Sequence, residues 1–174
     1  MNQFKSNTAF ALIGFLFVSI CGTLFHFVYH FFGENFLAGF FFPVNESAWE
    51  HMKLIFFPML IYGYIGRDRK FLDDEMLWKY AYCTLYATWL IPCLFYTYQG
   101  ILGFANTVLD ILVFFVSVLL GFLWFFIHNR HNTLSILTSS VLERILFSLV
   151  GIQLFCFLLF SYLPPALGIF LSPQ

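Results

Sequence analysis

The 174-residue chain is poor in charge. Only 10% of its residues are Asp, Glu, Lys or Arg, and the net charge is −1. A soluble domain carries about 25% charged residues. The chain also has no run of Lys and Arg, which is the footprint expected of a protein that binds nucleic acid. The composition therefore argues against a soluble domain and predicts no nucleic-acid partner.

The cysteines show no pairing pattern. Cys21, Cys83, Cys93 and Cys156 each stand alone inside an apolar segment, and no C-x-x-C pair occurs. Zinc knuckles and redox motifs need such closely spaced pairs. We interpret the four residues as small buried hydrophobic side chains.

Apolar residues make up 61% of the chain and aromatic residues 23%. A helix needs about 20 mostly apolar residues to cross a bilayer. The first apolar run is longer than the roughly 7–15 residues of a signal peptide, and no A-x-A-like cleavage site follows it, so we expect it to be kept as a span. The sequence predicts a single all-α integral membrane domain over 1–174, a bundle of about five transmembrane helices in the lipid bilayer. The predicted spans are about 8–32, 47–66, 78–99, 104–127 and 144–163.

The second span is the weakest of the five. Its purely apolar part, 54–65, is only about 18 Å long at 1.5 Å per residue. Before it, Gly33 and its neighbours are expected to end the first helix, and 36–42 is too short to cross, so we predict an interfacial or re-entrant piece there. Ser47 and Glu50 fit a capping box at the start of the next helix.

Basic residues predict the orientation. Of the eight Lys and Arg residues, seven fall on one side of five crossings and only Lys53 falls on the other. Cytoplasmic loops are enriched in Lys and Arg. We therefore predict that the N-terminus is inside and the C-terminus outside. The stretches 67–79 and 132–143 are expected to be loops on the inner side.

This orientation brings unusual polar residues to the outer ends of four helices. Ionisable groups at membrane depth are costly, and they mark functional sites. We expect the face of the first helix that carries His26 and several small residues to point into the bundle. Glu46, Glu50 and Lys53 are expected to share one face of the second span, with His51 directed toward Asp110 or the loop. The predicted outward-opening pocket consists of His26, His30, Asn45, Glu46, Glu50, His51, Lys53 and Asp110.

Three functions fit these residues. Binding of a cation, a proton or a small polar ligand is the working hypothesis, and a transporter of this size would need a homo-oligomer. The spacing of His26 and His30 at i, i+4 also suits a divalent metal such as zinc, as in H-E-x-x-H sites, and hence a metal-dependent intramembrane hydrolase. Finally, the residues could form only a packing network, with Glu50 beside Lys53 and His30 beside Asp110. The sequence leaves these alternatives open, including whether the protein is an enzyme.

The stretch from Pro43 to Tyr62, PVNESAWEHMKLIFFPMLIY, resembles a PVNES-x-WEH-x-KL block found in a family of small uncharacterised bacterial membrane proteins. The HFVY run at 26–29, the segment 96–103 with Asp110 after it, and Pro164-Pro165 resemble further blocks of that family. The resemblance covers nearly the whole chain. It implies a multi-pass protein of the bacterial cytoplasmic membrane with five or so spans, and it implies no activity, because the function of the family is unknown.

Overall fold

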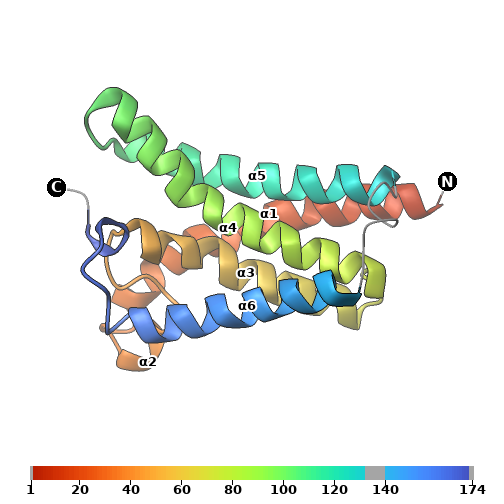
Figure 1. Cartoon of the computed structure of the whole chain (residues 1–174), viewed down its shortest axis with the longest axis horizontal. Helices are drawn as coiled ribbons and strands as arrows, with labels where there is room; N and C mark the ends of the chain where they lie inside the picture. The colour runs from red at the N-terminus through yellow and green to blue at the C-terminus, as the bar shows by residue number, and fades with distance from the viewer. Residues whose placement is uncertain (1, 132–139, 173–174) are drawn as a thin grey trace.

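The computed structural model describes residues 2–131 and 140–172, and these residues contain helices and no strand. Five long helices lie alongside one another, and the short α2 (Phe36–Gly39) and the 3-10 helix η1 (Gly168–Phe170) both lie at the same end of the bundle (Figure 1). The all-α prediction is confirmed. The long helices are α1 (Asn2–Phe31), α3 (Ala48–Asp68), α4 (Asp74–Leu102), α5 (Thr107–His131) and α6 (Ser140–Phe160).

Three of the helices have the length and the apolar composition to cross a membrane. These are α1 over Asn7–Phe31, α5 over Thr107–Asn129 and α6 over Val141–Phe160. Helices α3 and α4, with 21 and 29 residues, are also long enough, but they are more polar. Most residues of α3 are buried against the other helices, so few of them need to be compatible with lipid. These apolar helices fit a membrane protein.

Gly33 ends α1 as predicted. Gly33 and Glu34 have φ values of +65° and +59°, in the left-handed region that favours glycine. The backbone N–H of Glu34 donates to the carbonyl of Tyr29 at 3.0 Å, which satisfies the end of the helix. The short piece predicted at 36–42 is helical only over α2, which Asn35 caps with its side chain.

The capping box at the start of α3 is only half present. The Ser47 hydroxyl accepts from the backbone N–H of Glu50 at 3.3 Å, as predicted. The Glu50 carboxylate does not return to the backbone of Ser47; it accepts from the N–H of Val44 at 2.9 Å. The N–H of Ser47 donates instead to the Asn45 side chain at 2.9 Å. Glu50 is turned inward because it pairs with a buried lysine of its own helix.

The predicted charged loop is much shorter than 67–79. Helix α3 continues to Asp68 and α4 begins at Asp74, because the Asp73 side chain caps α4. Lys79 lies inside α4, is buried, and donates to Glu75 at 2.8 Å. Of the second predicted loop, residues 132–139 lie outside the described residues, and α6 already begins at Ser140.

Close packing confirms which face of α1 points into the bundle. A Cβ added to Gly22 would lie 2.5 Å from the carbonyl oxygen of Leu54 and 2.6 Å from the ring of Phe114, so only glycine allows this approach of α1 to α3 and α5. On the other side of the bundle, Trp89 of α4 donates to the Gln153 side chain of α6 at 3.1 Å. This hydrogen bond joins α4 to α6.

Candidate functional site

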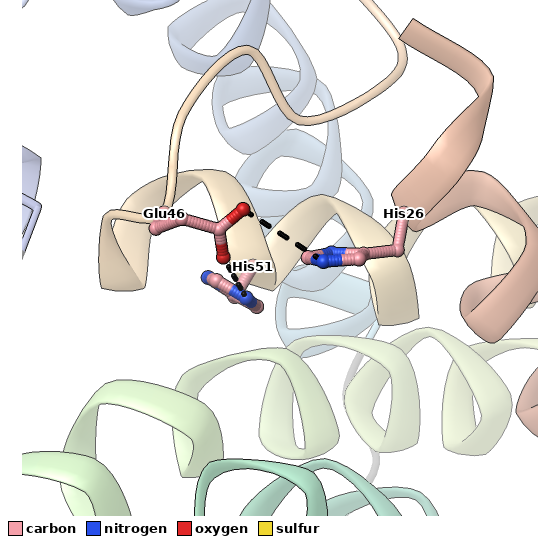
Figure 2. Close-up of side chains that lie close together, drawn as sticks. All are labelled: His26, Glu46 and His51. Atoms are coloured by element: carbon pink, nitrogen blue, oxygen red, sulfur yellow. Dashed lines mark ion pairs between the residues drawn. The ribbon is translucent and has the colours of Figure 1, made fainter. Parts of the chain in front are cut away.

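Three of the predicted site residues meet at one point. The carboxylate of Glu46 lies between two imidazole rings, as Figure 2 shows. Its Oε1 is 3.7 Å from Nε2 of His26, and its Oε2 is 3.4 Å from Nε2 of His51. One ligand atom from each residue lies within 4.8 Å of the other two. We call these three residues the His–Glu–His cluster.

The local structure explains how these side chains come together. His26 lies in the last turns of α1, and Glu46 immediately precedes the N-cap residue of α3. His51 is in the first turn of α3, where its ring can point back toward the loop that precedes the helix. The cap therefore holds Glu46 and His51 in a fixed relation, and the packing of α1 on α3 adds His26.

The hydrogen bond on the far side of His51 fixes the tautomer of this ring. Its Nδ1 lies 2.9 Å from the carbonyl oxygen of Ser47. A carbonyl only accepts, so Nδ1 is the nitrogen that carries the proton. In the neutral ring, Nε2 then presents a lone pair to the Glu46 carboxylate. Two facing lone pairs repel, so this contact is favourable only with a proton or a cation between the two atoms.

The cluster fits a small divalent cation. Zinc binds imidazole nitrogen and carboxylate oxygen at 2.0–2.2 Å with tetrahedral geometry, which places neighbouring ligand atoms about 3.3 Å apart. The Glu46 oxygens lie 3.7 Å (Oε1 to His26) and 3.4 Å (Oε2 to His51) from the nitrogens, and one ligand atom from each residue lies within 4.8 Å of the other two, so a modest inward shift of the side chains gives the spacing that zinc needs. Ligating histidines usually donate their second ring nitrogen to a carbonyl or carboxylate, as His51 does to Ser47. Two imidazoles and one carboxylate also leave a fourth position open.

The cluster opens into a pocket of about 640 Å³ between α1, α3, α4 and α5. All three cluster residues line it, and so do Asn106 and Asp110 from the start of α5. Four of the eight predicted pocket residues thus line a pocket at the end of the bundle that carries α2 and the turn between α4 and α5, the end that Figure 1 shows opposite the N-terminus. Its described lining contains two carboxylates and two histidines, but no Lys or Arg.

Asp110 lies on the wall of the pocket, across from α3. Its Oδ1 accepts from the hydroxyl of Tyr98 on α4. The same hydroxyl accepts from the backbone N–H of Asn106 at 3.2 Å. The predicted direction of His51 is thus only partly right: His51 meets the loop through Glu46, whereas Asp110 is held by Tyr98.

His30 does not join the cluster. Its Nδ1 lies 3.3 Å from the Glu34 carboxylate, and its side chain is 67% exposed. The prediction that His26 and His30 ligate one ion from a single helix face is therefore wrong for this arrangement, as is the pairing of His30 with Asp110. Glu34, four residues after His30 and beyond the turn at Gly33, is the nearer acid.

Glu50 and Lys53 form a separate, buried ion pair. Nζ of Lys53 lies 2.8 Å from Oε2 of Glu50, and the two side chains are 0% and 2% exposed. Lys53 also donates to the carbonyl of Gly39, at 2.9 Å, and to the Ser161 hydroxyl. The predicted pairing within α3 is confirmed. The expected common face with Glu46 is wrong, because Glu46 lies before the helix begins.

This ion pair holds the segment that carries Glu46 in place through hydrogen bonds. Glu50 accepts from the backbone of Val44, and Lys53 donates to the backbone of Gly39. Both contacts lie within the connection between α1 and α3. Asn45 is a turn residue there, since its side chain accepts from the N–H of Ser47. The predicted site residues thus divide into a ligand cluster and the groups that hold it in place.

Two sets of contacts were not predicted from the sequence: the contact of Tyr98 with Asp110, and the contacts of Lys53 with Gly39 and Ser161. The contact of Tyr98 with Asp110 could have been predicted, because both residues lie close to the short turn that joins α4 to α5. Ser161 is 108 residues away from Lys53 in the sequence, and no local pattern indicates that contact.

Comparison with known proteins gives the family and nothing closer. No curated protein and no solved structure matches the chain. A family of unknown function (DUF6512) matches residues 1–173, which is nearly the entire chain. The chain therefore belongs to this uncharacterised family.

Proposed function

We propose that this protein is a five-span membrane protein of the bacterial cytoplasmic membrane, with its N-terminus in the cytoplasm and its C-terminus outside. Helices α3 and α4 supply the two further crossings, since each is long enough to span the roughly 30 Å hydrocarbon core. The excess of Lys and Arg on the N-terminal side supports the orientation. Lys53, the exception on the outer side, is buried in an ion pair.

The function that the geometry supports best is binding of a divalent transition-metal cation, with zinc as the best fit, in the outward-facing pocket. The observation that carries this proposal is the Glu46 carboxylate between the Nε2 atoms of His26 and His51. The Nδ1 hydrogen bond of His51 directs the lone pair of Nε2 to the same point. Imidazole and carboxylate ligands around an open position are typical of catalytic zinc.

Equilibrium dialysis against buffered zinc tests this proposal with matched histidine variants. Wild type is expected to retain close to one zinc per chain, and His51→Ala to lose most of it, because the variant removes one of three ligands. His30→Ala, which changes a histidine four residues from His26 but outside the cluster, is expected to keep wild-type zinc. Equal retention by His51→Ala and wild type, with both proteins folded, would contradict the assignment.

A metal-dependent hydrolase is the second candidate, and the pocket favours it. The open position of the cluster faces a cavity that Asp110 also lines. Zinc in such a site activates water, and Asp110 is the carboxylate available to accept the proton. We expect turnover of a lipid or peptide ester to vanish with chelator and to fall at least about 100-fold in Asp110→Asn, the scale of general base catalysis. Uptake of metal that follows the membrane potential, without turnover, would indicate a transporter instead.

A further inference from the structure

The pocket changes character along its length. His26, Glu46 and His51 lie at its outer end. One turn deeper, about 4.5–6 Å at 1.5 Å per residue, the lining becomes mostly apolar, with Gly22 below His26 on α1 and Leu54 below His51 on α3. Thr23 also lies at this level, but its hydroxyl donates to the carbonyl of Ser19 within α1. The same change occurs on α5, from Asp110 to the aromatic residues one turn below. A cavity that is polar at one end and apolar at the other matches an amphiphilic ligand.

The pocket also reaches the lipid-facing surface. Phe27 of α1 and Ile111 of α5 both line it, and their side chains are 63% and 52% exposed. In Figure 1 the turn between α4 and α5 stands apart from the ends of the other helices, and residues 105–107 of this turn line the pocket. A ligand dissolved in the outer leaflet can therefore enter sideways, without passing through water.

Size and charge narrow the ligand class. A volume of about 640 Å³ is typical of a site for one small molecule, which favours a single acyl chain over a two-chain phospholipid. The described lining carries the carboxylates of Glu46 and Asp110 and no basic residue. Without a bound cation these carboxylates repel an anionic head. With zinc bound, their two charges and the charge of the ion sum to zero, so the site favours a neutral head, and the carboxylate oxygens accept hydrogen bonds from its hydroxyl groups.

We propose that the pocket binds a neutral, hydroxyl-bearing single-chain lipid of the monoacylglycerol class. The glycerol hydroxyls lie near the His–Glu–His cluster and Asp110, and the acyl chain extends inward along Leu54, Ile91 and Phe114. The inference rests on the proposed metal site only for the position of the head. The position of the acyl chain is inferred from the apolar inner part of the pocket and from its opening toward the lipid.

Photolabelling in phosphatidylcholine nanodiscs tests the proposal, with a monoacylglycerol that carries a diazirine in its acyl chain. We expect label on residues 91–95 and 111–115, and we expect excess monooleoylglycerol to compete at least tenfold better than oleate. Thr23→Trp places an indole in the pocket one turn below His26, and its labelling is expected to fall at least tenfold. Leu24→Trp, on the lipid-facing side of the same helix, is the matched control and keeps the label.

Label spread evenly over the lipid-facing residues of α1, competition by oleate equal to that by monooleoylglycerol, or full labelling of a folded Thr23→Trp protein would each overturn the inference. Val113→Trp, on the opposite wall, replaces Thr23→Trp if that variant does not fold. Zinc retention measured on the same samples separates the two proposals. In the wild-type protein, zinc retention without labelling overturns the lipid site alone, whereas labelling without zinc retention overturns the metal site alone.

Discussion

Lys53→Met is expected to lower the free energy of unfolding by about 3–5 kcal/mol, the cost of breaking a buried ion pair by removal of one partner. The variant leaves the Glu50 carboxylate, which is 2% exposed, without its counter-ion. It also removes the hydrogen bonds that Lys53 donates to Gly39 and Ser161. Thermal unfolding in detergent measures the effect, and a loss of this size corresponds to a fall in Tm of roughly 6–20 °C.

Two further variants show whether burial is the cause. Arg67→Met breaks the 2.6 Å ion pair between Arg67 and Asp74, in which the two side chains are 50% and 90% exposed. This variant is expected to lower the free energy of unfolding by at most about 1 kcal/mol. The double variant Lys53→Met/Glu50→Gln removes both charges, and it should recover a large part of the loss. If Lys53→Met costs no more than Arg67→Met, the buried pair does not hold the connection between α1 and α3.

Glu46→Gln is expected to weaken zinc binding at least about 100-fold. Substitution of residues that only support metal ligands already costs roughly 10–100-fold in affinity. Glu46 is the central ligand of the proposed site and the only anion of the cluster. The two oxygens of Glu46 lie 3.7 and 3.4 Å from the two imidazoles. The neutral amide of the variant therefore lacks the negative charge that faces both rings. Competition with a fluorescent zinc chelator measures the affinity.

Glu34→Gln is the matched control for this change. Glu34 lies in the same connection and also faces a histidine, His30, at 3.3 Å, but it is outside the cluster. The zinc affinity of the Glu34→Gln protein is expected to remain within about twofold of wild type. The loss in Glu46→Gln is also expected without a comparable fall in Tm, because the Glu46 side chain is 61% exposed and does not support the core. Equal affinities in the two variants would remove Glu46 from the site.

Features that depend on nearby residues were predictable from the sequence. The break at Gly33, the cap at Ser47 and the pairing of Glu50 with Lys53 each involve residues within a few positions of one another. Hydrophobic runs likewise gave the all-α architecture, because a helix that meets lipid must be apolar over most of its length. The start of α4 was predicted too late in the sequence because Lys79 was expected to lie in a solvent-exposed loop. In the structure Lys79 is buried in the bundle beside Glu75.

The composition of the site was predictable, but its pairing was not. Helical spacing brings His26 and His30 to the same side of α1, but it does not show that the His30 side chain is 67% exposed and meets Glu34 instead. The meeting of His26 with His51 depends on how α1 packs on α3. The position of Glu46 depends on the loop between them, which a buried lysine holds from within the bundle. Such contacts between helices leave no periodic signal in one sequence.

The zinc X-ray absorption spectrum of the loaded wild-type protein tests the central claim most directly, because it reports the atoms that bind the metal. Two imidazole nitrogens and two oxygens, one from Glu46 and one from water, are expected at about 2.0–2.2 Å. In His51→Ala, one imidazole is expected to disappear from the spectrum. A shell of six oxygens, a sulfur shell at about 2.3 Å, or an unchanged imidazole count in His51→Ala would contradict the assignment of the His–Glu–His cluster as the metal site.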